Sequence, residues 1–139
     1  MEREILFRAK AINRDIGSHR TNYKNGDWIY GLVTRLYDNR FENLPAEMRN
    51  LSGVNGIEIN HKTIGQYTGL TDKNGTKIFE GDIVKNSRFN KIEEVRYIDK
   101  RKRIMFCGIN YIVDLEYINE IYYEVIGNIY DNPELLKKE

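Results

Sequence analysis

The side chains that most often perform catalysis or hold metal ions are few in this sequence of 139 residues and lie far apart along it. Its two histidines, His19 and His61, match no recognised spacing of zinc ligands. The one cysteine, Cys107, precedes Gly108 in a predicted hairpin connection, and a nucleophilic thiol needs a basic partner that the sequence does not place beside it. We therefore expect no metal site, no small-molecule cofactor and a buried, unreactive thiol.

Acidic residues and glycines also lack a catalytic pattern. Glu93, Glu94 and Asp82 are candidate acids, but without convergent partners they are expected to belong to a surface. Gly81 precedes Asp82 at the start of a predicted strand, and no stretch has the Gly-x4-Gly-Lys-Ser/Thr spacing of a phosphate-binding loop. The pair is expected to let the chain enter a strand after a bend. The sequence predicts that the protein is not an enzyme.

Charge is the most unevenly distributed property of the sequence. The formal net charge is +1, yet residues 85–103 are net basic, whereas residues 104–136 contain no Lys or Arg and several acids. The candidate contact residues in the basic segment are Lys91, Arg96, Lys100, Arg101, Lys102 and Arg103. The acids that follow are Asp114, Glu116, Glu120, Glu124, Asp131 and Glu134.

Two interpretations of this segregation involve contacts between protein surfaces. In the first, the basic strand 91–103 lies beside the acidic strand 111–126 in one molecule, where each exposed ion pair contributes about 0.2–1 kcal/mol. In the second, the basic face of one copy meets the acidic face of another, and tyrosines fill the interface core. The candidate interface residues are Tyr111, Tyr117, Tyr122 and Tyr123.

The third interpretation is nucleic-acid binding by the basic hairpin 85–103. Tyr97 or Phe89 would stack on bases, as aromatic side chains do in small β-barrels that bind single strands. The nearly neutral chain counts against this interpretation, because nucleic-acid-binding domains usually carry a strong basic excess. The sequence leaves all three interpretations open.

The composition favours strands over helices. The chain has ten Tyr and five Phe but three Ala, and aromatic and β-branched side chains fit a pleated surface better than a helix. Eleven Gly and two Pro indicate that most turns are built from Gly and Asn. The predicted fold is mainly β, with antiparallel strands forming a small, partly open barrel or sandwich of SH3-like type and a short C-terminal helical turn.

Short alternating or apolar runs between turn residues mark the predicted strands. They cover residues 5–10, 28–33, 56–60, 63–68, 82–85, 93–97, 103–106, 111–113 and 124–126. The turn at residues 72–75 and the connection at residues 107–110 predict hairpins. The aromatic residues assigned to the core are Trp28, Tyr30, Tyr67, Phe79 and Phe106.

Two segments are predicted not to be strands. Residues 35–56 have little pattern and are expected to be loop, with one helical turn around residues 45–50. At the other end, Asn132 is suited to cap a helical turn and Pro133 to occupy its first position.

One domain is expected over residues 1–139, with an N-terminal strand layer at about 1–60 and a C-terminal barrel-like meander at about 61–139. The sequence has no apolar run of the roughly 18 residues that a membrane-spanning helix needs, and no signal peptide is recognisable. A single cysteine is compatible with a reducing compartment. We therefore expect a cytoplasmic protein with no membrane partner.

Several ordered motifs resemble those of the YopX family of phage and prophage proteins. They are residues 64–75 (IGQYTGLTDKNG) and 78–85 (IFEGDIVK), the closing residues 125–136 (VIGNIYDNPELL), and the opening residues 3–9 with 28–31. The resemblance leaves residues 11–24 and 35–56 unsupported.

The resemblance implies a YopX-like, largely β fold and a gene carried by a phage or prophage, hence the cytoplasm of a bacterial host. It supplies no activity and no catalytic residue. The expected function is therefore that of a phage-derived accessory protein that acts by binding a protein partner or a second copy of itself. The alternative is a nucleic-acid-binding small β-barrel that uses the hairpin 85–103.

Overall fold

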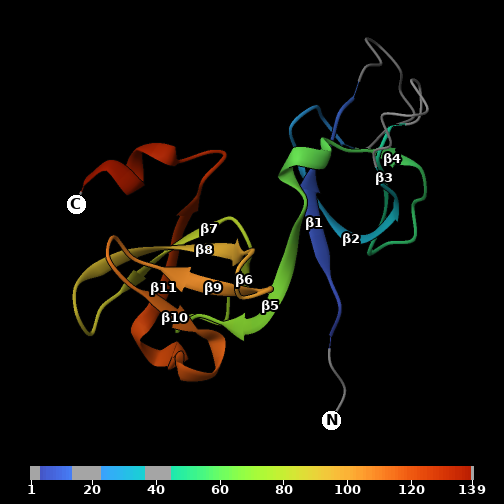
Figure 1. Ribbon diagram of the computed structural model, residues 1–139. Coiled ribbons are helices and arrows are strands. Elements are labelled where there is room, and N and C mark those ends of the chain that lie inside the picture. Colours follow the sequence, from blue (N-terminus) through green and yellow to red (C-terminus); the bar gives the residue numbers. More distant parts are fainter. Residues whose placement is uncertain (1–3, 14–22, 37–44, 139) are drawn as a thin grey trace. The chain divides into compact units, whose positions relative to one another are not determined.

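The structure is a computed structural model that describes residues 4–13, 23–36 and 45–138 (Figure 1). The chain forms two compact units: an N-terminal unit, Ile5–Gln66, and a C-terminal unit that contains Tyr67–Glu139. No helix within the described ranges is long and apolar enough to cross a membrane. His19 lies outside the described residues.

The N-terminal unit is an antiparallel sheet with a small core. Its strand order is β4-β3-β2-β1-β5. The strands are β1 (Phe7–Lys10), β2 (Trp28–Arg35), β3 (Glu47–Asn50), β4 (Ile57–Glu58) and the start of β5 (Gly65–Thr71). The core is built from Ala9, Ala11, Ile29, Ala46, Met48, Ile57 and Ile59. The short side chains in this set limit the apolar area that the unit buries.

Two predictions for this unit are wrong. Residues 47–50 form strand β3 instead of a helical turn, because pairing of Met48 with Val33 buries the methionine in the core. Tyr30 is 38% exposed instead of buried. Trp28 is half-buried, with the Arg8 guanidinium carbon 4.5 Å from its ring centroid. Trp28 is therefore only partly buried and interacts with a cation.

The C-terminal unit contains a five-stranded antiparallel sheet of order β10-β9-β8-β7-β11 (Figure 1). Its strands are β7 (Asp82–Asn86), β8 (Lys91–Ile98), β9 (Arg103–Cys107), β10 (Ile112–Asp114) and β11 (Tyr123–Asn128). Because β10 and β11 are the two edges, this sheet does not close into a barrel. The remainder of β5 pairs with β6 (Lys77–Phe79) as a hairpin. The predicted mainly β, partly open antiparallel fold is confirmed, as are both predicted hairpins.

Aromatic residues contribute to the packing of the C-terminal unit. Phe106 and Tyr123 meet edge to face with ring centroids 5.1 Å apart, and Tyr67 packs against Phe79 at 5.5 Å. The predicted burial of Tyr67, Phe79 and Phe106 is confirmed. Cys107 is buried too, as expected.

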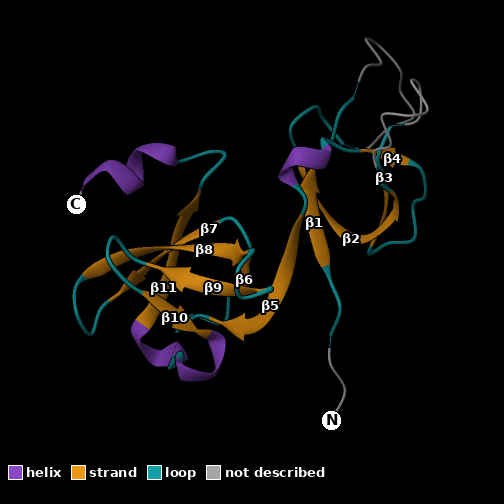
Figure 2. Ribbon diagram, in the orientation of Figure 1, coloured by secondary structure: helices purple, strands orange, loops and turns teal. Residues whose placement is uncertain are grey.

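The helical segments of the described chain are short 3-10 turns (Figure 2). They are η1 (His61–Thr63), η2 (Leu115–Tyr117), η3 (Glu120–Tyr122) and η4 (Pro133–Lys138). The last confirms the predicted C-terminal helical turn. Turns η2 and η3 carry the chain from β10 to β11.

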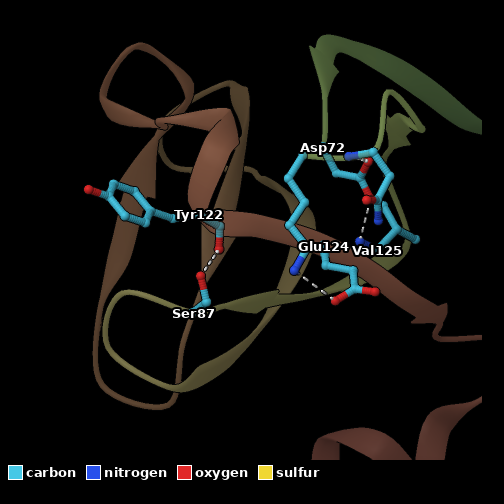
Figure 3. Close-up of polar contacts among 7 residues, drawn as sticks. Asp72, Ser87, Tyr122, Glu124 and Val125 are labelled. Carbon is cyan, nitrogen blue, oxygen red and sulfur yellow. Dashed lines mark hydrogen bonds and ion pairs between the residues drawn. The ribbon is translucent and has the colours of Figure 1, made fainter.

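The Asp72 carboxylate fixes the β5–β6 turn and joins it to β11 (Figure 3). Its Oδ1 accepts hydrogen bonds from the backbone N–H groups of Asn74 and Thr76, each 2.9 Å long. Its Oδ2 accepts from the backbone N–H of Val125, also at 2.9 Å. Gly75 completes the turn with a φ of +81°, a conformation that suits glycine. One buried side chain thus connects the hairpin to a strand that follows 53 residues later.

Backbone contacts extend this connection to the start of β11. The Lys73 N–H donates to the Tyr123 carbonyl oxygen at 2.9 Å, and the Lys73 ammonium lies 3.4 Å from Glu124. Ser87, which follows β7, donates to the Tyr122 carbonyl oxygen from both its N–H and its hydroxyl, at 2.8 and 3.0 Å (Figure 3). Tyr122 and Tyr123 are therefore held between two hairpins.

The pKa of Asp72 reflects these contacts. Burial raises it, but the N–H groups of Val125, Thr76 and Asn74 stabilise the ionised form, and the pKa ends below its ordinary value of 3.8. A group whose pKa falls on folding stabilises the folded state above its unfolded pKa. That stabilisation is lost as the pH falls through the folded pKa.

Asp72→Asn is expected to lower the free energy of unfolding by about 1–3 kcal/mol at neutral pH, because one of the three N–H donors loses its acceptor. The difference from the wild type should stay constant from neutrality down to the ordinary pKa of 3.8 and shrink as the pH falls further, through the lower pKa of folded Asp72. Urea denaturation at several pH values measures both effects. Asp99→Asn, at an exposed turn, is the matched control; an equal loss in both variants would contradict this role for Asp72.

Candidate ligand-binding pocket

A cavity of about 430 Å³ opens in the C-terminal unit. Its walls come from the end of β7, the β7–β8 turn, the start of β8, the chain around β10 and the segment from η2 to the start of β11. This volume is within the roughly 300–1,000 Å³ of small-molecule sites. The aromatic lining residues are Phe89, Tyr111, Tyr117, Tyr122 and Tyr123. The others are Asn86, Arg88, Lys91, Glu93, Val113 and Asn119.

Glu93 is the most unusual residue of the lining, because it is fully buried at 0% exposure. It shares a face of β8 with Val95 of the core, since side chains two residues apart on a strand point the same way. Its Oε2 accepts hydrogen bonds from the Tyr111 hydroxyl and from Asn86 Nδ2, the latter at 3.5 Å. Its Oε1 has no hydrogen-bond partner in the described part of the chain. An unsatisfied buried acceptor is unfavourable, and it is a natural contact for a ligand donor.

Tyr123 and Asn86 form the inner wall beside this carboxylate. They face each other across β11 and β7, and Asn86 Nδ2 donates to the Tyr123 hydroxyl oxygen at 3.2 Å. Burial and, after it, the nearby Glu93 raise the pKa of Tyr123 well above its ordinary value of 10.0. The Tyr123 hydroxyl therefore stays protonated at neutral pH.

The outer part of the pocket combines exposed aromatic rings with cations. Phe89 is 64% exposed and Tyr117 is 74% exposed. The Arg88 guanidinium carbon lies 5.3 Å from the ring centroid of Phe89 and 5.5 Å from that of Tyr122. Lys91, directly opposite Asn86 in the β7–β8 pairing, adds a second positive charge. The pocket thus has aromatic and amide walls, one buried acid and a cationic rim.

The structure brings five of the predicted contact residues to this pocket: Lys91, Tyr111, Tyr117, Tyr122 and Tyr123. The other basic candidates are elsewhere. Lys100, Arg101 and Lys102 are exposed in the β8–β9 turn, and Arg96 is exposed on β8. Of the predicted stacking residues, Phe89 lines the pocket, whereas Tyr97 is exposed on β8 outside that lining.

Several acids of the segment 104–136 are already engaged within the unit. Asp114 forms a two-point ion pair with Arg103, with both N–O distances 2.6 Å. Glu120 accepts from the Thr71 hydroxyl at 2.5 Å and from its N–H at 2.9 Å. The Arg103–Asp114 pair joins the basic and acidic segments in one molecule, as the first interpretation of the charge pattern expects.

The prediction that Glu93 and Asp82 belong to the surface is wrong. Asp82 is 2% exposed, and its Oδ2 accepts from the Phe79 N–H at 2.8 Å. The alternation of β8 contained a signal for Glu93, because it lies two residues before the apolar Val95. The adjacent Glu94 obscured this signal, because the sequence pattern then shows one acid on each face of the strand.

Among the described residues, no group of three metal-ligating side chains comes together.

Gly108 makes the position of Tyr111 possible. A methyl group at residue 108 would overlap the Tyr111 ring, while the Gly108 N–H donates to the Tyr111 carbonyl oxygen at 2.9 Å. The two residues therefore form a tight connection whose aromatic ring reaches Glu93.

Gly108→Ala is expected to push the Tyr111 ring away and break its hydrogen bond to Glu93, with a loss of about 1–3 kcal/mol in the free energy of unfolding. Tyr111→Phe removes the same hydrogen bond and should give a similar loss, whereas Tyr117→Phe, on an exposed ring of the same pocket, should have little effect. Urea denaturation measures the losses, and NMR of the tyrosine rings reports the displacement. An unchanged Tyr111 spectrum in Gly108→Ala would contradict this account.

Comparison with known proteins places the chain among relatives. The family described as YopX protein matches residues 33–137, so the opening motifs at residues 3–9 and 28–31 lie outside the match. Protein EF1440 from Enterococcus faecalis, known from a crystal structure, is 27% identical, with a TM-score of 0.58 over 97% of this chain and 99% of that one. No curated protein matches the sequence. Because the family match covers most of the chain, the protein belongs to the YopX family.

Proposed function

We propose that the protein binds single-stranded nucleic acid through the aromatic pocket of its C-terminal unit, without catalysis and without a cofactor. The observation that carries the proposal is the combination of exposed Phe89 with Arg88 and Lys91 at the mouth of an aromatic cavity. Bases of single strands can leave the stack and enter such a cavity, whereas paired bases must first be unpaired and unstacked at a cost of about a few kcal/mol.

The aromatic side chains supply the base contacts in this proposal. Stacking of a base on a protein ring contributes about 1–3 kcal/mol, and it tolerates any base because each has a π-face. Phe89 and Tyr117 expose large parts of their rings beside the pocket.

The rim cations supply the phosphate contacts. Arg88 and Lys91 flank Phe89 on the β7–β8 connection, so a strand whose base enters the pocket would pass its phosphates over them. This basic contact is local, which makes it compatible with a chain of formal net charge +1. Such contacts weaken as salt rises, because binding releases counterions from the nucleic acid.

Self-association and a protein partner are the competing expectations. Self-association through opposite charges has less support, because Asp114 and Glu120 already interact with Arg103 and Thr71 of the same unit. Tyr123, a candidate interface residue, is buried and forms part of the pocket wall.

We further propose that the protein is a phage or prophage product that acts in the cytoplasm of a bacterial host. Membership of the YopX family supports this origin.

The test measures binding of labelled single-stranded DNA and RNA by fluorescence anisotropy over a series of salt concentrations. The wild type should bind at low salt, and Lys91→Ala and Arg88→Ala should each reduce the slope of log K against log salt by about 0.7. Phe89→Ala should weaken binding by about 1–3 kcal/mol with an unchanged slope. Lys100→Ala, at the exposed β8–β9 turn, is the matched control and should change neither quantity.

Failure to bind either nucleic acid at low salt would overturn the proposal. An effect of Lys100→Ala as large as that of Lys91→Ala would move the contact to the tip of the β8–β9 hairpin. Light scattering tests the competing expectation, because a stable dimer at high micromolar concentration that dissociates on Tyr117→Ala would assign the pocket face to self-association.

A further inference from the structure

One atom inside the pocket has chemistry that the stacking and phosphate contacts do not use. Glu93 is fully buried, its Oε2 is held by the Tyr111 hydroxyl and by Asn86, and its Oε1 has no partner among the residues described. A carboxylate only accepts hydrogen bonds, so Oε1 is an acceptor like Oε2. A ligand that satisfies Oε1 must therefore bring an N–H or O–H donor.

We infer that the pocket selects guanine among the bases, with Oε1 of Glu93 accepting a hydrogen bond from its 2-amino group. This inference rests on the proposed function and names the base that the same pocket prefers. The contact replaces an unsatisfied buried acceptor with a charge-assisted hydrogen bond, which is the stronger kind.

The donor patterns of the bases decide this preference. Guanine carries two adjacent donors on its Watson–Crick edge, and a carboxylate offers only acceptors. Adenine and cytosine present one amino group next to a ring-nitrogen acceptor, which a carboxylate repels. Uracil and thymine present one N–H between two carbonyl acceptors. A buried acceptor therefore favours guanine and rejects uracil and thymine most strongly.

The neighbours of Glu93 act as positioning residues. Tyr111 and Asn86 hold Oε2 and so leave Oε1 for the ligand. Asn86 is fixed in turn, because its side-chain carbonyl accepts from the Arg88 N–H at 3.0 Å and its backbone pairs with both β8 and β11. The acid is thus preorganised by side chains that also form the wall.

The rest of the lining fits the remainder of a guanine nucleotide. The tyrosine rings provide apolar and stacking surface for the base, and Arg88 and Lys91 lie where a phosphate would be neutralised. A simple amine would satisfy Oε1 but would meet two like charges at the rim. The ligand class that matches acid, aromatic rings and cations together is therefore a nucleotide whose base is rich in donors.

The experiment uses the full chain and titrates it with GMP, IMP, AMP, CMP and UMP, observed through tyrosine fluorescence and NMR. The wild type should bind GMP at least about tenfold more tightly than IMP, which lacks the 2-amino group, and than UMP. This comparison needs no variant, so it is independent of any loss of folding. Equal affinities for GMP, IMP and UMP would overturn the inference.

Glu93→Gln is the sharp variant, because it keeps the shape and replaces one acceptor with a donor. It should reduce the preference for GMP over IMP to less than about twofold, and Glu94→Gln, at the next position on the opposite face of β8, should leave the preference unchanged. An unaltered preference in folded Glu93→Gln would overturn the role of Glu93.

The two proposals fail differently. If no oligonucleotide binds but GMP binds with the stated preference, single-strand binding is overturned, and the pocket remains a site for free guanine nucleotides. If oligonucleotides bind through Lys91 and Phe89 but every base binds equally, single-strand binding holds and the selection of guanine is overturned.

Discussion

The carboxylate of Asp72 is the interaction on which the architecture of the C-terminal unit depends most. Three backbone N–H groups converge on it, two from its own turn and one from β11. Edge strand β11 pairs with one neighbour in the sheet, so this second attachment limits its freedom to slip. Because β11 begins with Tyr123, the turn at Asp72 also determines where a wall of the pocket stands.

Glu93 shows a different balance between stability and function. Replacing Glu93 together with its partners Tyr111 and Asn86 by well-packed apolar side chains would remove an unsatisfied acceptor, a change that is often neutral or stabilising. The polar side chains around it instead keep the acid in place with one oxygen uncommitted. Local features that conflict with stability in this way are typical of functional sites.

The sequence was sufficient for the strands but not for the pocket. Alternation and turn residues located β7 to β11 to within a few residues, because each strand has an apolar face and ends at, or directly before, Gly, Asn or Asp. Segment 45–50 was misjudged because a strand of four residues, Glu47–Asn50, depends on pairing with β2 instead of on its own pattern. The pocket depends on Asn86, Glu93, Tyr111 and Tyr123 meeting across four separate segments, and tertiary contacts of this kind leave no local signature.

The contact between Gly108 and Tyr111 has a consequence for comparing members of the family. The backbone hydrogen bond of this connection needs no particular side chain at residue 108, so a relative with alanine or serine there would keep the β9–β10 pairing. It would nevertheless lack the space for the tyrosine ring above the buried acid. The residue type at position 108 of a related sequence thus indicates whether that relative has room for the tyrosine ring and the same cavity, or shares only the strand arrangement.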